Sequence, residues 1–301
     1  MRRLATLERV EIQDEYNASP TSRPVNPDFS TAVVSPEEPT DLGRRVVIAF
    51  LAFLTWLISV ALIAFVPAIF LYPYLASKGI SLSDGAEIVE FAKNDPTAVF
   101  LQIVAIIPAH LLTLLLAWLI ISQGRKYKFF ETLGWEKGGV RWWHYVAILV
   151  AFFFIGGIVG SFFPEQENDL LRILRSSRSA VYIIAFVATF SAPFIEELIY
   201  RGVLFSGFKK AFGMPISFVL VTILFALVHV PQYYPSYSTI FLLTLLSLTL
   251  TGVRVVSNNL LPCVVLHTVF NGFQSVMLVL EPHLRTAEQP APAAILQLLF
   301  K

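Results

Sequence analysis

Residues 193–202 read PFIEELIYRG and place two adjacent carboxylates and an arginine directly after a segment without charge. That segment, residues 179–195, contains no Asp, Glu, Lys or Arg. A charged side chain on the lipid face of a membrane helix costs at least ~2.5–3.5 kcal/mol at the bilayer centre. In a helix, Glu197 and Arg201 lie on one face in the favourable order, whereas Glu196 points about 100° away. The pattern predicts that Glu197 is paired and that Glu196 is free for chemistry.

The composition excludes a water-soluble globular protein, because 56% of the 301 residues are hydrophobic and only 14% are charged. Uncharged runs of 18 or more residues indicate membrane spans. Beside the segment that starts at Ser179, such runs are residues 46–72, 98–122, 146–163, 211–253 and 255–280. The run 211–253 is long enough for two spans, with a proline-containing turn at residues 231–235. The sequence therefore predicts an all-α, polytopic transmembrane helical bundle of about seven spans, with eight as the upper limit.

Basic residues next to the spans predict how the chain is oriented. Arg44 and Arg45 precede the first span, and five Lys and Arg residues lie in the loop 123–141. Because cytoplasmic loops carry an excess of Lys and Arg, the N-terminus is expected in the cytoplasm. No signal peptide or eukaryotic targeting signal is recognised, so a bacterial inner membrane is the expected location. The net charge of +1, without a large basic patch, argues against nucleic acid as a partner.

Three apolar segments each present a polar group with a partner four residues away. Beside the acidic pair, Phe225 precedes His229 by one helical turn, and Asn271 follows His267 by one turn. A lone membrane histidine usually makes one interhelical hydrogen bond. Several ionisable groups in a bundle interior with few other charges instead indicate a functional site. We therefore expect Glu196 to meet both histidines and Asn271.

These groups are the parts needed to hydrolyse a carbonyl compound with an activated water. A carboxylate desolvated between helices becomes a better acceptor for a proton from water. Neutral histidines can orient that water or donate to a developing negative charge, and an Asn amide is a suitable oxyanion donor. The chain has no G-x-S-x-G elbow, Gly-rich phosphate loop or H-E-x-x-H zinc helix. Serine-protease and phosphoryl-transfer chemistry are therefore disfavoured.

The three motifs resemble those of the CPBP family, the CAAX proteases and bacteriocin-processing enzymes that are also called the Abi family. They read E-E-x-x-x-R at 196–201, F-x-x-x-H at 225–229 and H-x-x-x-N at 267–271, in the family's order. The resemblance covers about a third of the chain, residues 179–280. It implies an intramembrane endopeptidase acting on a peptide or on a prenylated, lipid-anchored protein at the bilayer. One member removes the terminal tripeptide from prenylated CAAX proteins.

The resemblance implies four catalytic residues. Glu196 would be the general base that activates water, and His229 would bind or polarise that water. His267 and Asn271 would stabilise the oxyanion. The family is often labelled a metalloprotease, and Glu196, His229 and His267 could hold a zinc ion. The residues leave open whether a metal or the glutamate alone activates the water.

Other residues would support the site. The resemblance implies that Glu197 and Arg201 form a pair that keeps its shape and that Phe225 shapes the cavity wall. Cys263 is expected to be structural, because free cysteine commonly packs in cores. His110, in the middle of the second span, is expected to bond to a neighbouring helix.

The expected depths of Glu196 and His229 in the membrane conflict with a site that contains both residues. If the fourth span ends near Leu204, Glu196 lies ~12 Å from the cytoplasmic end, whereas His229 lies ~21 Å from the start of its span. The two can meet only if Pro193 kinks the fourth helix or if that helix extends toward Phe208.

The expected organisation has four parts: a disordered polar cytoplasmic tail (1–43), accessory transmembrane helices and loops (44–178), a catalytic transmembrane core (179–281) and a C-terminal tail (282–301).

Two alternatives to an endopeptidase stay open. One is a non-catalytic scaffold or bacteriocin self-immunity protein in which the polar cluster holds helices together. The other is a proton-coupled transporter, which is weaker because no inverted repeat is evident. The oligomeric state is not predicted.

Overall fold

The computed structural model of the chain describes residues 23–30, 42–164, 166–168, 171, 174 and 178–284. Within these residues every regular element is a helix, which confirms the all-α prediction. The elements are α2 (Leu42–Ser77), α3 (Gly85–Asn94), α4 (Pro96–Ser122), α5 (Phe129–Leu133), α6 (Trp142–Phe162), α8 (Arg178–Phe186), η1 (Val187–Ser191), α9 (Ala192–Glu197), η2 (Leu198–Leu204), α10 (Phe205–Phe212), α11 (Met214–Tyr233), α12 (Tyr237–Ser257) and α13 (Leu261–Leu284).

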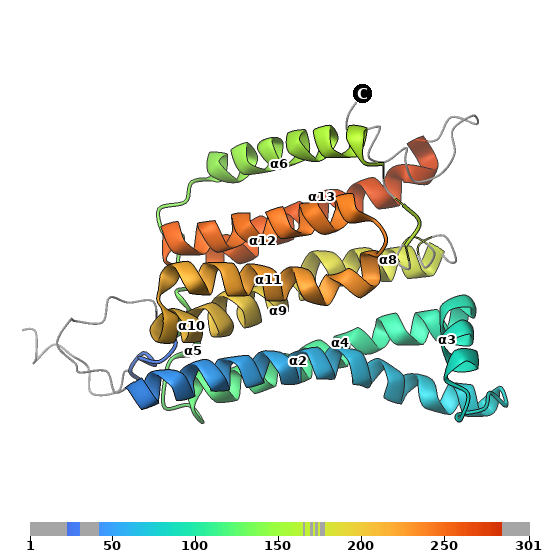
Figure 1. Cartoon of the computed structure of the whole chain (residues 1–301), viewed down its shortest axis with the longest axis horizontal. Helices are drawn as coiled ribbons and strands as arrows, with labels where there is room; N and C mark the ends of the chain where they lie inside the picture. Colours follow the sequence, from blue (N-terminus) through green and yellow to red (C-terminus); the bar gives the residue numbers. More distant parts are fainter. Residues whose placement is uncertain are drawn as a thin grey trace, which may run out of the picture.

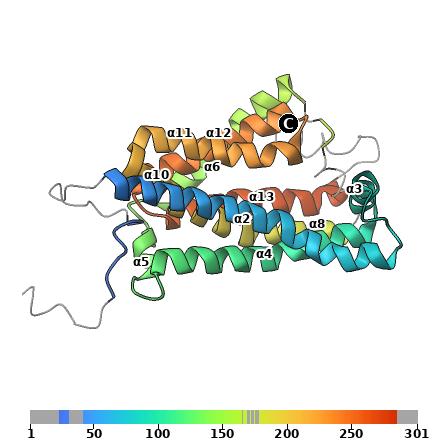
Figure 2. The same ribbon diagram turned by 60° about the horizontal axis from the view of Figure 1, so that its bottom comes forward.

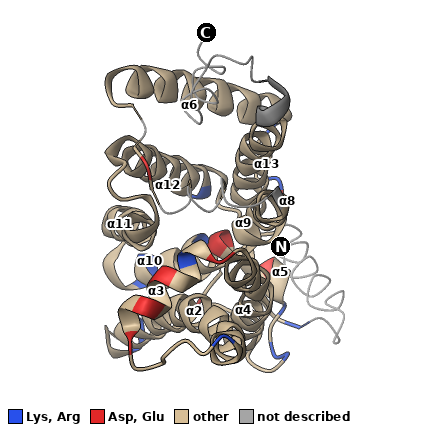
Figure 3. Ribbon diagram, turned by 90° about the vertical axis from the view of Figure 1, so that its right-hand side faces the viewer, with Lys and Arg blue, Asp and Glu red and all other residues tan. Residues whose placement is uncertain are grey.

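Seven helical segments in the described part are long and apolar enough to cross a membrane, so the predicted number is confirmed. They are Leu42–Ser77, Pro96–Ser122, Trp142–Phe162, Ser179–Phe212, Met214–Tyr233, Tyr237–Ser257 and Leu261–Leu280. The helices run side by side (Figure 1), and most of them carry neither acidic nor basic residues when seen along the bundle (Figure 3). The protein is an integral membrane protein.

The bundle has a densely packed side and a loosely attached helix. α2 packs on α4 and α10, while α13 packs on α8, η1 and α9. α6 lies at the opposite edge from α2 and α4 and packs mainly on α12 (Figure 1). α3 crosses one end of the bundle and α5 lies at the other (Figure 1 and Figure 2). The acidic motif on α9 is therefore enclosed by helices from both halves of the chain.

The contact between α2 and α10 depends on a glycine. A Cβ at Gly207 would lie 2.6 Å from the Cβ of Ala52, which is closer than real Cβ atoms approach. Two small residues therefore allow the two helix backbones to meet, as is common in membrane bundles.

The fourth span extends past Leu204, which is the second of the two alternatives that the spacing required. The helix continues through α10 to Phe212 and stops at Gly213, whose φ of 78° ends it. At ~1.5 Å per residue, Glu196 lies about 24 Å from Phe212, and His229 lies about 22 Å from the start of α11. The two motifs thus have the same depth, which removes the conflict in spacing. No kink at Pro193 is needed.

The prediction of a wholly disordered tail needs correction at residues 23–30, which pack against the bundle. Asn26 is fully buried; its amide nitrogen Nδ2 donates to the carbonyl of Ile121 at 2.8 Å. That carbonyl belongs to the last turn of α4, where the helix supplies no donor. Phe29 is buried in the main core, and Asp28 pairs with Arg44 at 2.9 Å. Residues 1–22, 31–41 and 285–301 lie outside the described residues.

Asn26→Ala is expected to lower the free energy of unfolding by about 1–3 kcal/mol, because the Ile121 carbonyl would be left buried without a donor. Thermal unfolding of the purified protein in detergent measures this change. Asn94→Ala, at an exposed position on α3, is the matched control and should change stability by less than about 0.5 kcal/mol. Equal stability of wild type and Asn26→Ala would show that the segment does not dock.

Candidate active site

The two adjacent glutamates differ sharply in their surroundings. The Glu197 side chain is fully buried, whereas 23% of the Glu196 side chain is exposed. Both are carried by α9, a short α-helical stretch between the two π-helical stretches η1 and η2. Such π segments inside longer helices are frequent at functional sites. The asymmetry expected from the sequence is present.

Glu197 belongs to a buried polar network. Its Oε1 lies 2.8 Å from Nη1 of Arg201, the i,i+4 pair anticipated from the sequence. Nη2 of Arg201 donates to the carbonyl and the hydroxyl of Ser247, and its Nε donates to the Thr251 hydroxyl. The arginine thereby joins the fourth span to α12. Nothing in the sequence marked Ser247 and Thr251 as its partners, because membrane helices commonly contain such small hydroxyl residues.

His267 lies between the two glutamates. Its Nδ1 is 2.8 Å from Oε1 of Glu197, and its Nε2 is 3.8 Å from Oε2 of Glu196. Because the carboxylate of Glu197 is paired with Arg201, it can only accept, so Nδ1 must carry the proton. In the neutral ring, Nε2 is then an acceptor that faces another acceptor, the Glu196 carboxylate. A water molecule that lies beside both atoms can donate a hydrogen bond to each of them.

Phe225 lies between the two histidines. Its ring centroid is 4.7 Å from that of His229 and 6.2 Å from that of His267, and the Arg201 guanidinium lies 4.9 Å from it. The Nδ1 atom of His229 donates to the Phe225 carbonyl at 2.7 Å, which leaves Nε2 as an acceptor. Within the described residues, no hydrogen bond joins His229 to Glu196. The aromatic ring therefore lies between the two histidines, and its role in shaping a cavity wall stays a prediction.

Asn271 does more than the sequence suggested. Its Nδ2 donates to the carbonyl of Ala188 in η1 at 2.9 Å. In η1 the amide of Ala192 bonds to Val187, five residues back. In the same register, Ala188 would need the amide of residue 193, which is a proline and has no N–H. Asn271 supplies the missing donor, and its second amide proton remains for other chemistry.

Asn271→Ala is expected to lower the free energy of unfolding by about 1–3 kcal/mol, because the Ala188 carbonyl loses its donor. Adding Pro193→Ala restores a backbone N–H, so the double variant should unfold at a higher temperature than Asn271→Ala alone. Thermal unfolding of the wild type, both single variants and the double variant measures this coupling. Strictly additive effects would contradict this structural role of Asn271.

The fit of a metal to this site is partial. Both histidines are oriented through Nδ1, by a carboxylate and by a backbone carbonyl, as metal-binding histidines usually are. In the described part of the chain, however, no three His, Cys, Asp or Glu side chains lie close enough together to hold an ion. Glu196, His229 and His267 thus do not form a ligand set, and we derive the chemistry below from protein groups and water.

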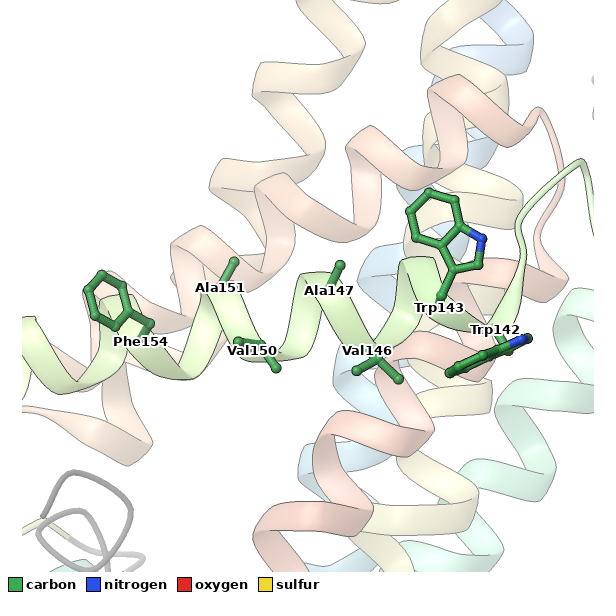
Figure 4. Close-up of a pocket in the computed structure, with 7 residues that line it drawn as sticks. All are labelled: Trp142, Trp143, Val146, Ala147, Val150, Ala151 and Phe154. Carbon is green, nitrogen blue, oxygen red and sulfur yellow. The ribbon is translucent and has the colours of Figure 1, made fainter.

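Two other features lie outside this site. Cys263 is fully buried and bonds through Sγ to the carbonyl of Leu250, in keeping with a structural role. An apolar hollow runs along α6 and is lined by Trp142, Trp143, Val146, Ala147, Val150, Ala151 and Phe154 (Figure 4). All of its lining residues come from one peripheral helix, and none carries a group that could activate water. We assign this hollow to the lipid-facing surface.

Residues 178–273 match the family model described as type II CAAX prenyl endopeptidase Rce1-like. We call residues 178–273 the Rce1-like domain, after the family model to which they are similar. The match begins at α8 and ends in α13, and it includes Glu196, His229, His267 and Asn271, so the predicted resemblance is confirmed. Comparison with curated proteins and with solved structures gives no match.

The Rce1-like domain does not enclose its acidic motif alone. α4 lies outside the matched residues, yet it contacts η1, α9 and η2. Its His110 is buried and lies 3.1 Å from the Ser191 hydroxyl, so the expected bond to a neighbouring helix exists. The sequence placed this histidine in the middle of a span but did not reveal that it reaches the helix of the acidic motif.

Proposed function

We propose that this protein is an intramembrane endopeptidase that hydrolyses a peptide bond with a water molecule activated by Glu196. The substrate class is a CAAX-type or related membrane-associated peptide. The observation that carries the proposal is the different bonding of the two neighbouring glutamates. Glu197 is bound by Arg201 and His267, whereas Glu196 keeps its oxygens available, 3.8 Å from the His267 ring.

In the first step, Glu196 removes a proton from a water molecule that is hydrogen-bonded to both its Oε2 and Nε2 of His267. The water oxygen attacks the carbonyl carbon of the scissile peptide, and the carbonyl oxygen becomes an oxyanion. A carboxylate held close to the water and partly shielded from solvent is suited to this role. Pairing of Glu197 with Arg201 prevents the second carboxylate from competing for the proton.

In the second step, the tetrahedral intermediate collapses and the C–N bond breaks. Glu196 returns its proton to the leaving amine, so the base ends the cycle as the carboxylate and no proton is left over. The free N–H of Asn271 is the donor proposed for the oxyanion. His267 acts in the first step, in which its Nε2 accepts a hydrogen bond from the water and its Nδ1–H bond to Glu197 fixes the orientation of the ring. His229 accepts a hydrogen bond from substrate or water through Nε2.

The family match supports a protease of the CAAX type, because its description names an endopeptidase. The lipid-exposed helices around the site suit a substrate that is itself anchored in the bilayer. In the orientation proposed from the basic loops, the N-terminus and α5 face the cytoplasm. A bacterial inner membrane is the proposed location.

The test is cleavage of matched prenylated and unprenylated peptides by the purified protein in detergent, each with and without a chelator. We expect hydrolysis to appear and to persist with the chelator. A requirement for the prenyl group would assign the CAAX class, and equal cleavage of both forms would point to another membrane peptide. Activity lost on chelation and restored by zinc would replace glutamate-activated water with metal-activated water. No hydrolysis of any peptide would contradict the proposal.

A further inference from the structure

Side chains from two other helices form hydrogen bonds with η1, the segment just before the short helix that carries Glu196. On the α13 side, Asn271 bonds to Ala188, and Ser275 accepts from the Thr189 hydroxyl at 3.0 Å. On the α4 side, His110 bonds to Ser191 at 3.1 Å. The three residues of η1 that take part, Ala188, Thr189 and Ser191, lie within one helical turn. This part of the helix is thus fixed by side chains that reach it from other helices.

The direction of the bond from α4 follows from the hydroxyl proton. Ser191 donates its only proton to the carbonyl of Val187. His110 must therefore donate from Nδ1 to the Ser191 oxygen. Ser191 is the last residue of η1 and directly precedes α9. Any displacement of Ser191 is consequently passed on to the short helix that carries Glu196.

The backbone at this point needs support, because Pro193 removes a donor and η1 departs from α-helical geometry. In the described part of the chain, the Glu196 carboxylate makes no side-chain hydrogen bond, and its ion-pair contact is with His267 at 3.8 Å. The position of that carboxylate therefore depends on where α9 is held. A shift of about 1 Å in a reacting group can cost about 10²-fold in rate.

We propose that His110 is a positioning residue of the active site, supplied by the accessory helices rather than by the Rce1-like domain. Through the Ser191 hydroxyl it holds the η1–α9 junction so that Glu196 faces the water and His267. The activity readout rests on the proposed endopeptidase function, whereas the structural readout below does not.

The first test is steady-state hydrolysis by His110→Ala, His110→Asn, His110→Gln and Ser191→Ala. We expect His110→Ala to lower kcat about 10–100-fold with KM nearly unchanged. The reason is that the Glu196 carboxylate would be misplaced, whereas substrate binding would not change. His110→Asn keeps an N–H near the position of Nδ1 and should restore most of kcat, whereas His110→Gln should not. His110→Ala combined with Ser191→Ala should be no worse than either single variant. His144→Ala, on peripheral α6, is the control and should match wild type.

The second test is amide hydrogen exchange of residues 187–196 in the wild type and His110→Ala. Loss of the His110–Ser191 hydrogen bond should raise the exchange rate in this segment and leave the exchange rates of α11 and α12 unchanged. Unchanged exchange, or equal kcat for His110→Ala and wild type, would overturn the positioning role. A parallel Glu196→Gln assay separates the two proposals: hydrolysis that survives Glu196→Gln refutes the function, while the exchange result still decides the role of His110.

Discussion

Glu196→Gln is expected to lower kcat for peptide hydrolysis by about 10²–10⁴-fold, because an amide cannot take the proton from water. The exchange keeps the size and polarity of the side chain. Since Glu196 has no short ion pair, the variant should also unfold at nearly the same temperature as wild type. Progress curves at saturating substrate give kcat, and thermal unfolding in detergent shows that the protein is folded.

Two controls sharpen this result. Glu131→Gln removes a carboxylate from α5, at an exposed position away from the site, and should leave kcat unchanged. Glu197→Gln leaves the Arg201 guanidinium without its counter-charge and should reduce both stability and activity. If Glu196→Gln hydrolyses peptide at the wild-type rate while Glu197→Gln is folded and inactive, the roles of the two glutamates are reversed.

Arg201→Ala is expected to lower the free energy of unfolding by about 3–5 kcal/mol, because it leaves the Glu197 carboxylate buried without a counter-charge. Both side chains of this pair are fully buried, and Arg201 also bonds to Ser247 and Thr251. The substitution therefore breaks the link between the fourth span and α12 as well. Reversible unfolding in detergent with increasing denaturant measures the difference.

Lys137→Ala removes a positive charge from an exposed position and is the matched control; it should change stability by less than about 0.5 kcal/mol. The double variant Arg201→Met with Glu197→Leu removes both charges and should be more stable than Arg201→Ala. If Arg201→Ala is as stable as Lys137→Ala, the buried pair does not hold the bundle together.

The helices were predictable because the bilayer imposes a long uncharged run on each span. The partner of Arg201 was predictable for a local reason: Glu197 lies one turn away on the same face. The links from His267 to Glu197 and from Asn271 to Ala188 join residues 70 and 83 positions apart. Such contacts depend on how the helices pack, and periodicity within one helix does not specify that.

The π-helical stretches could not be read from the sequence either. The register of η1 depends on Pro193 and on side chains that reach it from α4 and α13, so local propensity alone does not define it. Residues 23–30 present a similar case. Their polar composition predicts disorder. However, Asn26 donates a hydrogen bond to the Ile121 carbonyl at the end of α4, and Phe29 packs in the hydrophobic core.

The central claim is that this protein cuts a peptide bond within a membrane by means of Glu196. Mass spectrometry of a prenylated peptide, incubated with the protein in liposomes, tests it most directly. The account predicts that the wild type and Glu131→Gln cut the peptide once. This cut gives a C-terminal fragment with a new amine and an N-terminal fragment whose new carboxylate contains oxygen from labelled water. It predicts no such fragment from Glu196→Gln in the same time. An intact peptide with the wild type, or the same fragment at the same rate from Glu196→Gln, would contradict the claim.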